Sequence, residues 1–452
     1  MRIRFLGGVG TVTGSKYVIE TESARIMVDC GLFQGYKNLR MRNWAPLPVP
    51  AASIDAVILT HAHIDHSGYL PLLVRQGFSG KIHATQATID LAAILLPDSA
   101  WLQEKDAEYA NRHGFSKHHP ALPLYDRGDA ARVLGHFSPL DFGEKLALPD
   151  GLELTFHRAG HILGAAMAEI GTPAGTILFS GDLGRPDSPI MYPPARIARA
   201  DWLVLESTYG DRVHDGESAE DALADIIGRT ARRGGSVIVP AFAVGRAQTL
   251  LFYLAHLRDA GRIPDLPVYL DSPMAIDATA LYCRHARDHR LDAEETRRIF
   301  GIAHIVHEPE ESKALDSDPH PKIIVSASGM ATGGRVLHHL KHYVTDPRNT
   351  VLFTGYQAGG TRGAAMIGGA PQIRIHGEEF PVNAEIGMLG MLSAHADQQE
   401  IMNWTNGFTH PPRRTFIVHG EPQAADALRQ RIERERGWDV TVPDYRDEAE
   451  LT

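Results

Sequence analysis

The chain has 452 residues, with 45 Lys and Arg against 55 Asp and Glu, and a formal net charge of −10. This length exceeds one ordinary hydrophobic core, so we expect two or more compact units. The acidic balance argues against a protein that coats nucleic acid through bulk electrostatics, but a local basic groove is compatible with it.

Cysteine usage and hydropathy indicate a reducing, aqueous compartment. Cys30 and Cys283 lie far apart in the sequence, so we expect free thiols and no cysteine-based zinc site. We find no long apolar signal region at the start and no later apolar run of membrane-spanning length. The expected location is cytoplasmic, without membrane contact.

Short strands are predicted near residues 3–6, 17–20 and 25–29, with a glycine-rich turn at residues 7–10. A dinucleotide-binding fingerprint would need a helix after that turn, but residues 15–20 look like another strand. Asp29 closes the third strand, so its carboxylate can lie at the sheet edge. Taken alone, an Asp before Cys30-Gly31 is more often a turn residue.

The strongest motif is His61-Ala62-His63-Ile64-Asp65-His66, which directly follows the apolar run of residues 55–60. That run reads as a buried strand. Imidazole and carboxylate ligands suit zinc and other late transition metals, and a carboxylate can bridge two ions. The motif therefore favours a dinuclear hydrolytic centre over a single structural ion.

A helix over residues 67–76 and a strand over 81–84 complete a strand–helix–strand unit, with the histidine cluster at the carboxyl end of the first strand. Residues 85–111 are predicted to be helical, with a break at Pro97. His113, His118 and His119 follow without a carboxylate at ligand spacing. We interpret these three histidines as surface residues.

Three strand-like runs between residues 152 and 180 precede two further candidate ligands, His161 and Asp182. Both are flanked by glycines, which let the backbone approach an ion closely. A strand is then predicted over residues 202–205, and Glu206 follows it directly. Each of these polar residues alone would be read as a turn residue, so the interpretation depends on their appearance after the histidine cluster.

Residues from about 207 to 384 alternate between helix and strand, which indicates a separate parallel-sheet domain. Glycine-rich loops and arginines at its strand ends offer N–H groups and positive charge to phosphate, although glycine turns also end strands for steric reasons alone. The candidate substrate-binding residues are Arg246, Ser328, Gly329, Gly333, Gly334, Arg335, Gln357 and Thr361, with Arg362 nearby.

The last part, from residue 385, returns to the first pattern. We assign to it a strand near Ala384 to Met388, a strand over residues 415–418, a helix over 421–435 and a strand over 440–442. His395 and His419 lie beside small residues in positions like those of the earlier candidate ligands. Either could also be structural.

In these motifs the chain resembles the metallo-β-lactamase-fold nucleases of the β-CASP group, which include the pre-mRNA 3′-end-processing endonuclease. The resemblance covers essentially the whole chain. It implies an α/β fold, in which a metallo-β-lactamase αββα sandwich (residues 1–206 and 385–452) carries an inserted parallel-sheet β-CASP domain (207–384). Asp29, residues 61–66, His161 and Asp182 match the four metallo-β-lactamase motifs, and Glu206, His395 and His419 match those of the β-CASP branch.

The resemblance also implies the site. His61, His63 and His161 would hold one zinc ion, Asp65, His66 and His419 a second, and Asp182 would bridge them, although manganese or iron can occupy such sites. Asp29 would orient a ligand through hydrogen bonds. His395, oriented by Glu206, would protonate the leaving oxygen or bind the scissile phosphate.

The expected function is therefore that of a zinc-dependent ribonuclease. Two zinc ions would supply a hydroxide that hydrolyses phosphodiester bonds of single-stranded RNA, in endonucleolytic or 5′-exonucleolytic mode or both. RNA would thread between the two domains, and homodimers are common in the group. The alternative is a hydrolase of a small ester, thioester or lactam, which would need neither Glu206, His395 nor the inserted domain.

Overall fold

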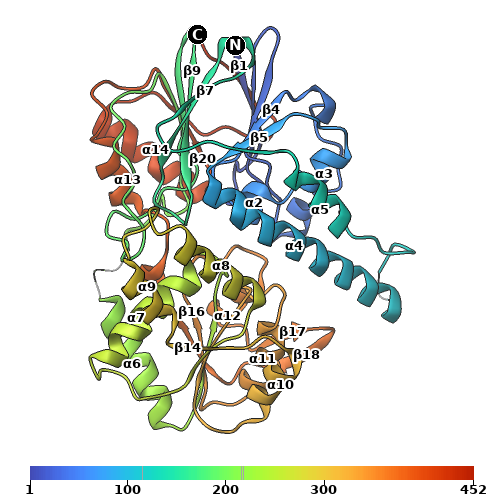
Figure 1. Cartoon of the computed structure of the whole chain (residues 1–452), viewed down its shortest axis with the longest axis vertical. Helices are drawn as coiled ribbons and strands as arrows, with labels where there is room; N and C mark the ends of the chain where they lie inside the picture. Colours follow the sequence, from blue (N-terminus) through green and yellow to red (C-terminus); the bar gives the residue numbers. More distant parts are fainter. Residues whose placement is uncertain (115, 215, 217) are drawn as a thin grey trace. The chain divides into compact units, whose positions relative to one another are not determined.

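The computed structural model describes residues 1–114, 116–214, 216 and 218–452, and it divides into two compact units (Figure 1). The first unit contains Met1–Val213 and His395–Thr452, and the second contains His214–Ala394. The chain thus leaves the first unit once and returns to it to complete its fold. No helix within the described ranges is long and apolar enough to cross a lipid bilayer.

The first unit is built on two seven-stranded sheets. The first sheet has the strand order β22 (Glu448–Glu450), β1 (Arg2–Gly7), β2 (Lys16–Glu20), β3 (Arg25–Val28), β4 (Ala56–Ile58), β5 (Lys81–Ala84) and β6 (Phe137–Pro139). The second has the order β21 (Val440–Thr441), β20 (Arg414–Val418), β11 (Trp202–Glu206), β10 (Gly175–Phe179), β9 (Ala166–Thr172), β8 (Glu153–Arg158) and β7 (Lys145–Ala147).

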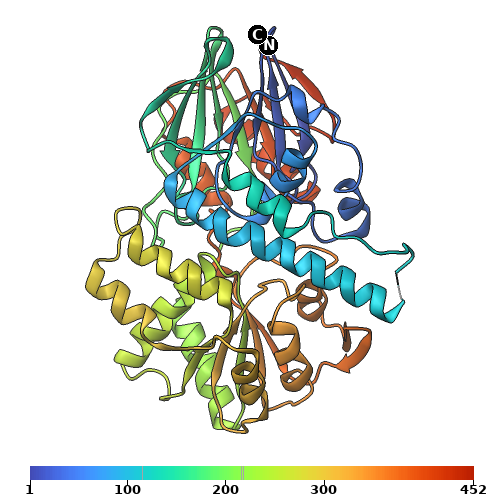
Figure 2. The ribbon, with the colours of Figure 1, turned by 45° about the vertical axis from the view of Figure 1, so that its right-hand side comes forward.

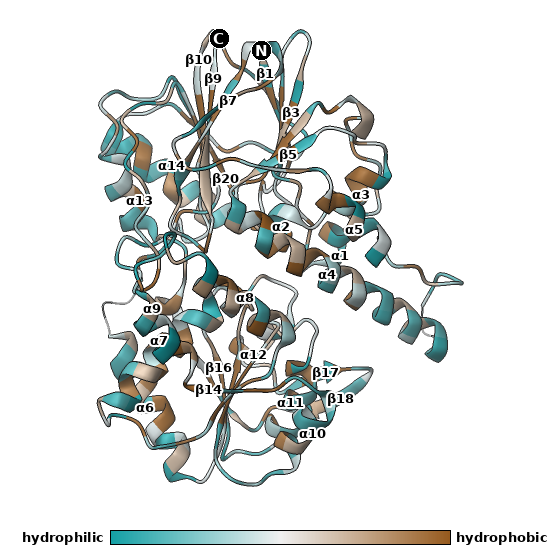
Figure 3. Ribbon diagram, in the orientation of Figure 1, coloured by the Kyte–Doolittle hydropathy of each residue, from teal (hydrophilic) through white to brown (hydrophobic). Residues whose placement is uncertain are grey.

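Side chains from the two sheets form one hydrophobic core. The ring centroids of Phe5 and Phe416 are 5.2 Å apart, and those of Tyr17 and Phe179 are 5.8 Å apart, so each pair joins one sheet to the other. Full burial of an aromatic or aliphatic side chain stabilises a fold by about 1.5–3 kcal/mol. The brown strands of Figure 3 follow this core, which holds the strand ends of both sheets in fixed positions.

Helices cover the outer faces of both sheets, as Figures 1 and 2 show. Those beside the first sheet are α2 (Ile64–Ser67), α3 (Leu70–Arg75), α4 (Gln86–His113) and α5 (Arg127–Leu134), while α1 (Lys37–Arg42) lies at the surface of the same unit and has no buried residue. Those beside the second are α13 (Gln398–Thr405) and α14 (Pro422–Arg436). Capping fixes several starts, since Thr85 accepts from Thr88 N at α4 and Asp126 forms a capping box at α5. The predicted αββα sandwich is confirmed.

Two predictions about these helices are wrong in detail. The helix expected over residues 67–76 is two short helices, α2 and α3, with α2 starting inside the histidine motif. The break expected at Pro97 is absent, because α4 continues through it to His113. Leu96 and Ala100 are fully buried on either side of Pro97, so packing of the apolar face outweighs the lost hydrogen bond.

The second unit contains a six-stranded sheet in which every neighbouring pair is parallel. Its order is β14 (Ala303–Ile305), β13 (Val268–Leu270), β15 (Ile323–Ser326), β12 (Val237–Pro240), β16 (Thr350–Phe353) and β19 (Glu385–Met388). The helices are α6 (Ala219–Arg232), α7 (Arg246–Asp259), α8 (Pro273–Arg284), α9 (Ala293–Phe300), α10 (Pro309–Ser317), α11 (Val336–Tyr343) and α12 (Arg362–Ile367), and β17 (Gln372–Ile375) pairs with β18 (Glu378–Pro381). The predicted inserted parallel sheet is confirmed.

One strand belongs to a different unit from the one expected. The strand near Ala384 to Met388 is β19, which pairs in parallel with β16 of the second unit. Its assignment to the last part of the first unit is wrong. The residues of a short edge strand do not indicate which of two sheets the strand will join.

Candidate metal centre

The candidate ligands lie where strands of the first unit end. Asp29 directly follows β3, and His61 follows β4 by three residues. His161, Asp182 and His419 lie one to three residues after β8, β10 and β20. Both sheets thus contribute to one site, as expected for the carboxyl ends of neighbouring strands.

His61, His63, His161 and Asp182 form a group that could hold one metal ion. The Nδ1 atom of His63 lies 3.2 Å from Nε2 of His61 and 3.2 Å from Nε2 of His161. Oδ2 of Asp182 lies 3.4 Å and 3.5 Å from the same two Nε2 atoms. Ligands about 2.0–2.1 Å from a tetrahedral zinc ion are separated from one another by roughly 3.3–3.4 Å, so these atoms fit such an ion.

Asp65, His66 and His419 form a second such group. Nε2 of His419 lies 3.1 Å from Nε2 of His66 and 3.2 Å from Oδ2 of Asp65. Oδ1 of Asp182 lies 3.2 Å from Nε2 of His66, while its Oδ2 faces the first group. Asp182 therefore has one oxygen toward each group, which is the geometry of a bridging carboxylate.

Burial controls the protonation of these side chains. Burial lowers the pKa of His61 and His161, and it lowers that of His63 to about 3. These imidazoles are therefore neutral near pH 7, which is the form that binds metals. Burial would likewise lower the pKa of His66, but Asp182, Asp29 and Asp65 outweigh it and raise that pKa well above its usual value.

The cluster fits a cation better than a set of mutual hydrogen bonds. Ring nitrogens of His61, His63 and His161 face one another, although neutral imidazoles cannot all donate at once. Among the described residues, the buried Oδ1 of Asp182 makes no hydrogen bond, and neither does Nδ1 of His161. Positive charge at the centre would satisfy Oδ1 of Asp182 and the ring nitrogens that face one another.

Asp29 and Thr60 hold two of the ligand rings from behind. Oδ2 of Asp29 lies 2.8 Å from Nδ1 of His66, and Oδ1 accepts the backbone N–H of Thr60 at 2.8 Å. The Thr60 hydroxyl contacts both Asp29 oxygens and lies 3.1 Å from Nδ1 of His61. Partners of this kind fix the tautomer and orientation of a ligating histidine.

Glu206 connects the second sheet to His395. Its side chain is fully buried, and Oε1 accepts the backbone N–H of Leu183 at 2.6 Å and lies 3.1 Å from Nδ1 of His395. This contact turns Nε2 of His395 toward Asp182, whose Oδ2 is 3.9 Å away. The ring thus lies beside the ligand cluster, with its position fixed by a carboxylate.

Thr208 is a site residue that the sequence analysis missed. Its hydroxyl lies 3.1 Å from Nδ1 of His419 and 3.3 Å from the backbone oxygen of the same residue. Its N–H donates to Oε2 of Glu206 at 3.2 Å. Threonine is common in and beside strands, so its residue type gives no signal of a site. The only signal in the sequence is the position of Thr208 two residues after Glu206.

Unusual backbone conformations occur at the ligand loops. Asp29 and His419 have positive φ angles of 56° and 49°, a region that non-glycine residues seldom occupy. A side chain at Gly184 would place its Cβ 1.9 Å from the backbone oxygen of Gly160, so only glycine fits beside the His161 loop. Gly184 thus lets two ligand loops pack closely, while the predicted approach of these glycines to an ion stays a prediction.

The candidate substrate-binding residues all lie in the second unit. Arg246 starts α7 after β12, Ser328 and its glycines follow β15, and Gln357 and Thr361 follow β16. Because β15, β12 and β16 are parallel neighbours, these loops share one edge of the sheet. The edge is rich in N–H donors and glycine, as phosphate contact requires.

The candidates differ in their contacts within the protein. Arg246 is buried, and its guanidinium lies against Gly355. Arg335 instead donates to Asp271 at 2.6 Å and to the backbone oxygens of Val306 and His307, which gives it a structural partner set. Thr361 caps α12 by accepting from Ala364 N, and Gln357 donates to Gly329 O and Gly355 O. Arg335 is therefore held by contacts within the protein, and Arg246 is a buried side chain at the same edge of the sheet.

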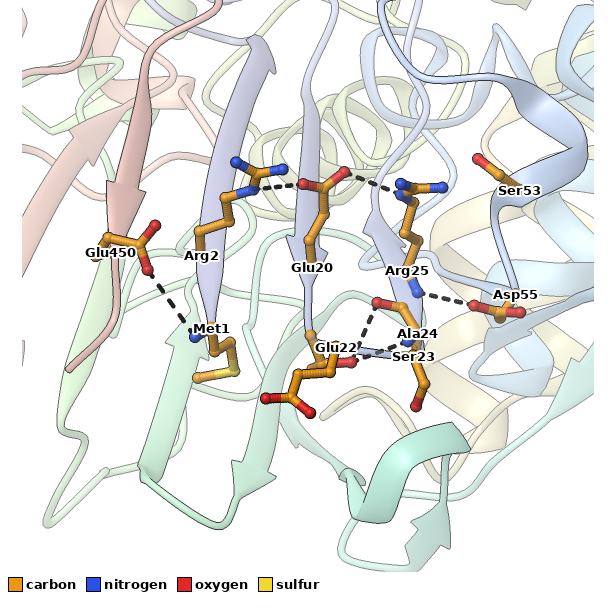
Figure 4. Close-up of a pocket in the computed structure, with 11 residues that line it drawn as sticks. Met1, Arg2, Glu20, Glu22, Ser23, Ala24, Arg25, Ser53, Asp55 and Glu450 are labelled. Carbon is orange, nitrogen blue, oxygen red and sulfur yellow. Dashed lines mark hydrogen bonds and ion pairs between the residues drawn. The ribbon is translucent and has the colours of Figure 1, made fainter.

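A surface pocket of about 420 Å³ lies elsewhere, at the far ends of β1, β2 and β3 from Asp29 (Figure 4). Glu20 stands between Arg2 and Arg25 and pairs with both, and the amino group of Met1 faces Glu450. These charges already satisfy one another. His113, His118 and His119 are exposed, as expected, and belong to no ligand group among the described residues.

A buried His/Asp cluster on an αββα sandwich with an inserted α/β unit defines a metal-dependent hydrolase of the metallo-β-lactamase fold. The family models that match describe a metallo-beta-lactamase superfamily domain over residues 9–218, a Beta-Casp domain over 247–366 and a Zn-dependent metallo-hydrolase RNA specificity domain over 379–443.

Curated relatives agree with these models. The chain is 38% identical over 451 residues to Ribonuclease TTHA0252 of Thermus thermophilus, covering 98% of each chain. It is 33% and 34% identical to the transcription termination factor FttA of Methanosarcina mazei and of Pyrococcus abyssi, covering 94% and 100% of this chain and 67% and 71% of those proteins. The chain belongs to the β-CASP family of metallo-β-lactamase-fold nucleases.

A solved structure shows the fold alone. A crystal structure titled as a protein of unknown function from Enterococcus faecalis V583 has a TM-score of 0.55, with 12% sequence identity and coverage of 100% of this chain and 99% of that one.

Proposed function

We propose that this protein is a zinc-dependent ribonuclease with two ions per chain. His61, His63 and His161 would hold one ion, Asp65, His66 and His419 would hold the other, and Asp182 would contribute one oxygen to each. The support is the pair of ligand groups and the two-sided position of Asp182. Neutral imidazole and carboxylate ligands suit zinc, and they also accept manganese or iron.

The proposed substrate is single-stranded RNA. The relatives include a protein named as a ribonuclease, and one matching model is described as an RNA specificity domain. Arg246 and the glycine loops of the second unit would contact phosphates there. We further infer a cytoplasmic location and a homodimer, the latter testable by sedimentation of the purified chain.

The observation that carries the proposal is the Glu206–His395 pair beside the ligand cluster. When bound, zinc ions supply positive charge that activates a water molecule and neutralises phosphate oxygens. Glu206 holds His395 through Nδ1, so that Nε2 can keep a proton directed at the site. His395 then gives this proton to the departing 3′ oxygen, leaving a 3′-hydroxyl and a 5′-phosphate.

A hydrolase of a small ester, thioester or lactam would use the same ligands. It would have no need for a buried carboxylate dedicated to His395, or for the second unit. The proposed ribonuclease function therefore accounts for both the Glu206–His395 pair and the second unit.

The test is incubation of zinc-loaded protein with a 5′-labelled single-stranded RNA of about 20 nucleotides, long enough for a one-strand groove. The control is the Asp65→Ala, His66→Ala variant. Internal fragments with 3′-hydroxyl ends would establish an endonuclease, and labelled mononucleotides would establish a 5′-exonuclease. Absence of cleavage by protein with two bound ions would refute the proposal.

His395→Ala separates proton transfer from metal binding. Because Nε2 lies beside the cluster but His395 stands outside the two sets assigned to the ions, we expect cleavage to fall by at least about 100-fold. Metal analysis should still find two ions per chain. Loss of an ion in this variant would instead make His395 a ligand and overturn its assigned role.

A further inference from the structure

The segment that follows Asp29 is basic in an otherwise acidic protein. Residues 30–54 contain no Asp or Glu but contain Lys37, Arg40 and Arg42, while the whole chain carries a net charge of −10. Within the described residues, none of these three cations forms an ion pair, although arginines elsewhere commonly pair with carboxylates. The positive charge of this segment is therefore uncompensated.

The same segment exposes large apolar side chains. Tyr36 is 54% exposed, Met41 52% and Trp44 56%, and helix α1 between them has no buried residue. We name residues 36–44 the α1 platform. The platform thus displays two aromatic rings, Tyr36 and Trp44, among cations that form no ion pair within the described residues, a composition typical of an interaction surface.

The platform is nevertheless held in a defined position. The Asn43 side chain accepts the N–H of Phe33 at 2.9 Å and donates to its oxygen at 2.8 Å. The guanidinium of Arg42 stacks 5.4 Å from the Phe33 ring and 4.1 Å from the Tyr445 ring. Stacking uses the face of the guanidinium and leaves its N–H edge for other partners.

The platform starts close to the candidate metal centre. Leu32 N donates to Ile64 O at 2.9 Å and Cys30 N donates to His66 O at 2.7 Å, so residues 30–32 lie against the helix that carries Asp65 and His66. Tyr36 follows Leu32 by four residues, which an extended chain spans in at most about 14 Å. A strand of RNA held at the centre could therefore reach the platform.

We propose that the α1 platform binds single-stranded RNA beside the cleavage site, with bases stacking on Tyr36 and Trp44 and phosphates contacting Lys37, Arg40 and Arg42. This inference rests on the proposed ribonuclease function. Aromatic side chains interleaved with cations bind single strands without sequence preference, because every base has a π-face. A duplex keeps its bases stacked inside and cannot use the rings in this way.

Charge complementarity selects RNA over a second copy of the chain. A symmetric dimer through this face would bring the platform against itself. Lys37, Arg40 and Arg42 would then face the same cations without any acid in residues 30–54 to pair with them. A polyanion satisfies these charges, and a second copy of this face does not.

Two sets of variants test the proposal. The first is Tyr36→Ala with Trp44→Ala, and the second is Lys37→Gln, Arg40→Gln and Arg42→Gln. Because Arg42 also packs on Tyr445, a version that retains Arg42 guards against loss of the fold. The matched control replaces three exposed cations of the first unit that form no ion pair among the described residues, Lys81→Gln, Lys117→Gln and Arg196→Gln.

Binding is measured in the His395→Ala background, so that the RNA is not consumed, by fluorescence anisotropy with a labelled single strand of about 20 nucleotides. We expect the aromatic variant to bind at least about 10-fold more weakly. The charge variant should weaken binding and make the slope of log K against log salt shallower by about 2, and the control should leave both unchanged.

Cleavage kinetics in the His395-containing enzyme distinguish failure of the proposed ribonuclease function from failure of the platform proposal. The platform variants should raise KM for the 20-nucleotide RNA about 10-fold or more. Their hydrolysis of bis(p-nitrophenyl) phosphate, which is too small to span the distance, should equal that of the parent. If the parent cleaves no RNA, the proposed function fails. If the parent cleaves RNA and the platform variants match it in binding and KM, the platform proposal fails alone. A lower oligomer mass in the variants would show an interface between copies and overturn RNA binding.

Discussion

Thr208→Val tests whether the hydroxyl behind His419 fixes that ring for metal binding. The Thr208 side chain is 2% exposed, and its hydroxyl lies 3.1 Å from Nδ1 and 3.3 Å from the backbone oxygen of His419. These distances fit a chain in which Nδ1–H donates to the hydroxyl and the hydroxyl donates to the backbone oxygen. Nε2 is then left with its lone pair toward Asp65 and His66.

Valine has nearly the shape of threonine but leaves the buried ring N–H without an acceptor. An unsatisfied buried donor costs about 1–3 kcal/mol, which corresponds to a loss of about 5- to 150-fold in affinity for the ion at that group. Thr208→Ser keeps the hydroxyl and is the matched control, with a loss of less than about 5-fold because only a methyl group is removed.

The assay is competition with a chromogenic chelator, which measures affinity without reference to activity. Thr208→Val should weaken binding of one of the two ions and leave the other at parental affinity, because the hydroxyl contacts His419, which belongs to one ligand group only. Equal affinity of Thr208→Val and the parent for both ions would refute the reasoning. So would an equal loss in Thr208→Ser.

Three further predictions concern other parts of the first unit. Asp29→Asn keeps the shape and tolerates the positive φ angle but removes the charge beside His66, so metal affinity by chelator competition should fall about 10- to 100-fold, and an unchanged affinity would contradict the role of Asp29. Burial raises the pKa of Asp98 from 3.8 to about 6, so the folded protein binds the extra proton between about pH 4 and pH 6 and loses up to about 3 kcal/mol of unfolding free energy as pH rises through this range. Asp98→Asn should remove this decline and raise the thermal midpoint at pH 7.5, whereas parallel stability profiles of parent and variant would show that Asp98 is not the titrating group. Gly184→Ala should destabilise the first unit by more than about 3 kcal/mol, because its Cβ would meet the Gly160 backbone, and a denaturation midpoint equal to that of the parent would show that the loop relaxes.

Much of the site was predictable because its residues are rare types at strand ends. His61, His63, Asp65 and His66 lie within six residues, and no structural role would gather them after a buried strand. His161 and Asp182 could be interpreted as metal ligands only because they follow that histidine cluster in the sequence. In the structure, Oδ2 of Asp182 lies 3.4–3.5 Å from ring nitrogens of His61 and His161.

Features that depend on tertiary contact were not predictable. Thr60 and Thr208 act through single hydroxyl groups, and threonine is common in strands for reasons of shape alone. β19 joined the sheet of the second unit because of its pairing with β16, which its own residues do not encode. Arg335 looked available for phosphate in the sequence, but its guanidinium donates a hydrogen bond to Asp271, more than sixty residues away.

The order of the ligands along the chain has a consequence for biosynthesis. His61, His63, His161 and Asp182 leave the ribosome long before His419, since the whole second unit is translated between them. At about 5–20 residues per second, the interval from residue 182 to residue 419 lasts roughly 12 to 47 seconds. During that time the nascent chain holds one complete ligand group and one that lacks its last histidine. The second ligand group is therefore complete only after the second unit has been synthesised and β20, which precedes His419, has paired with β11.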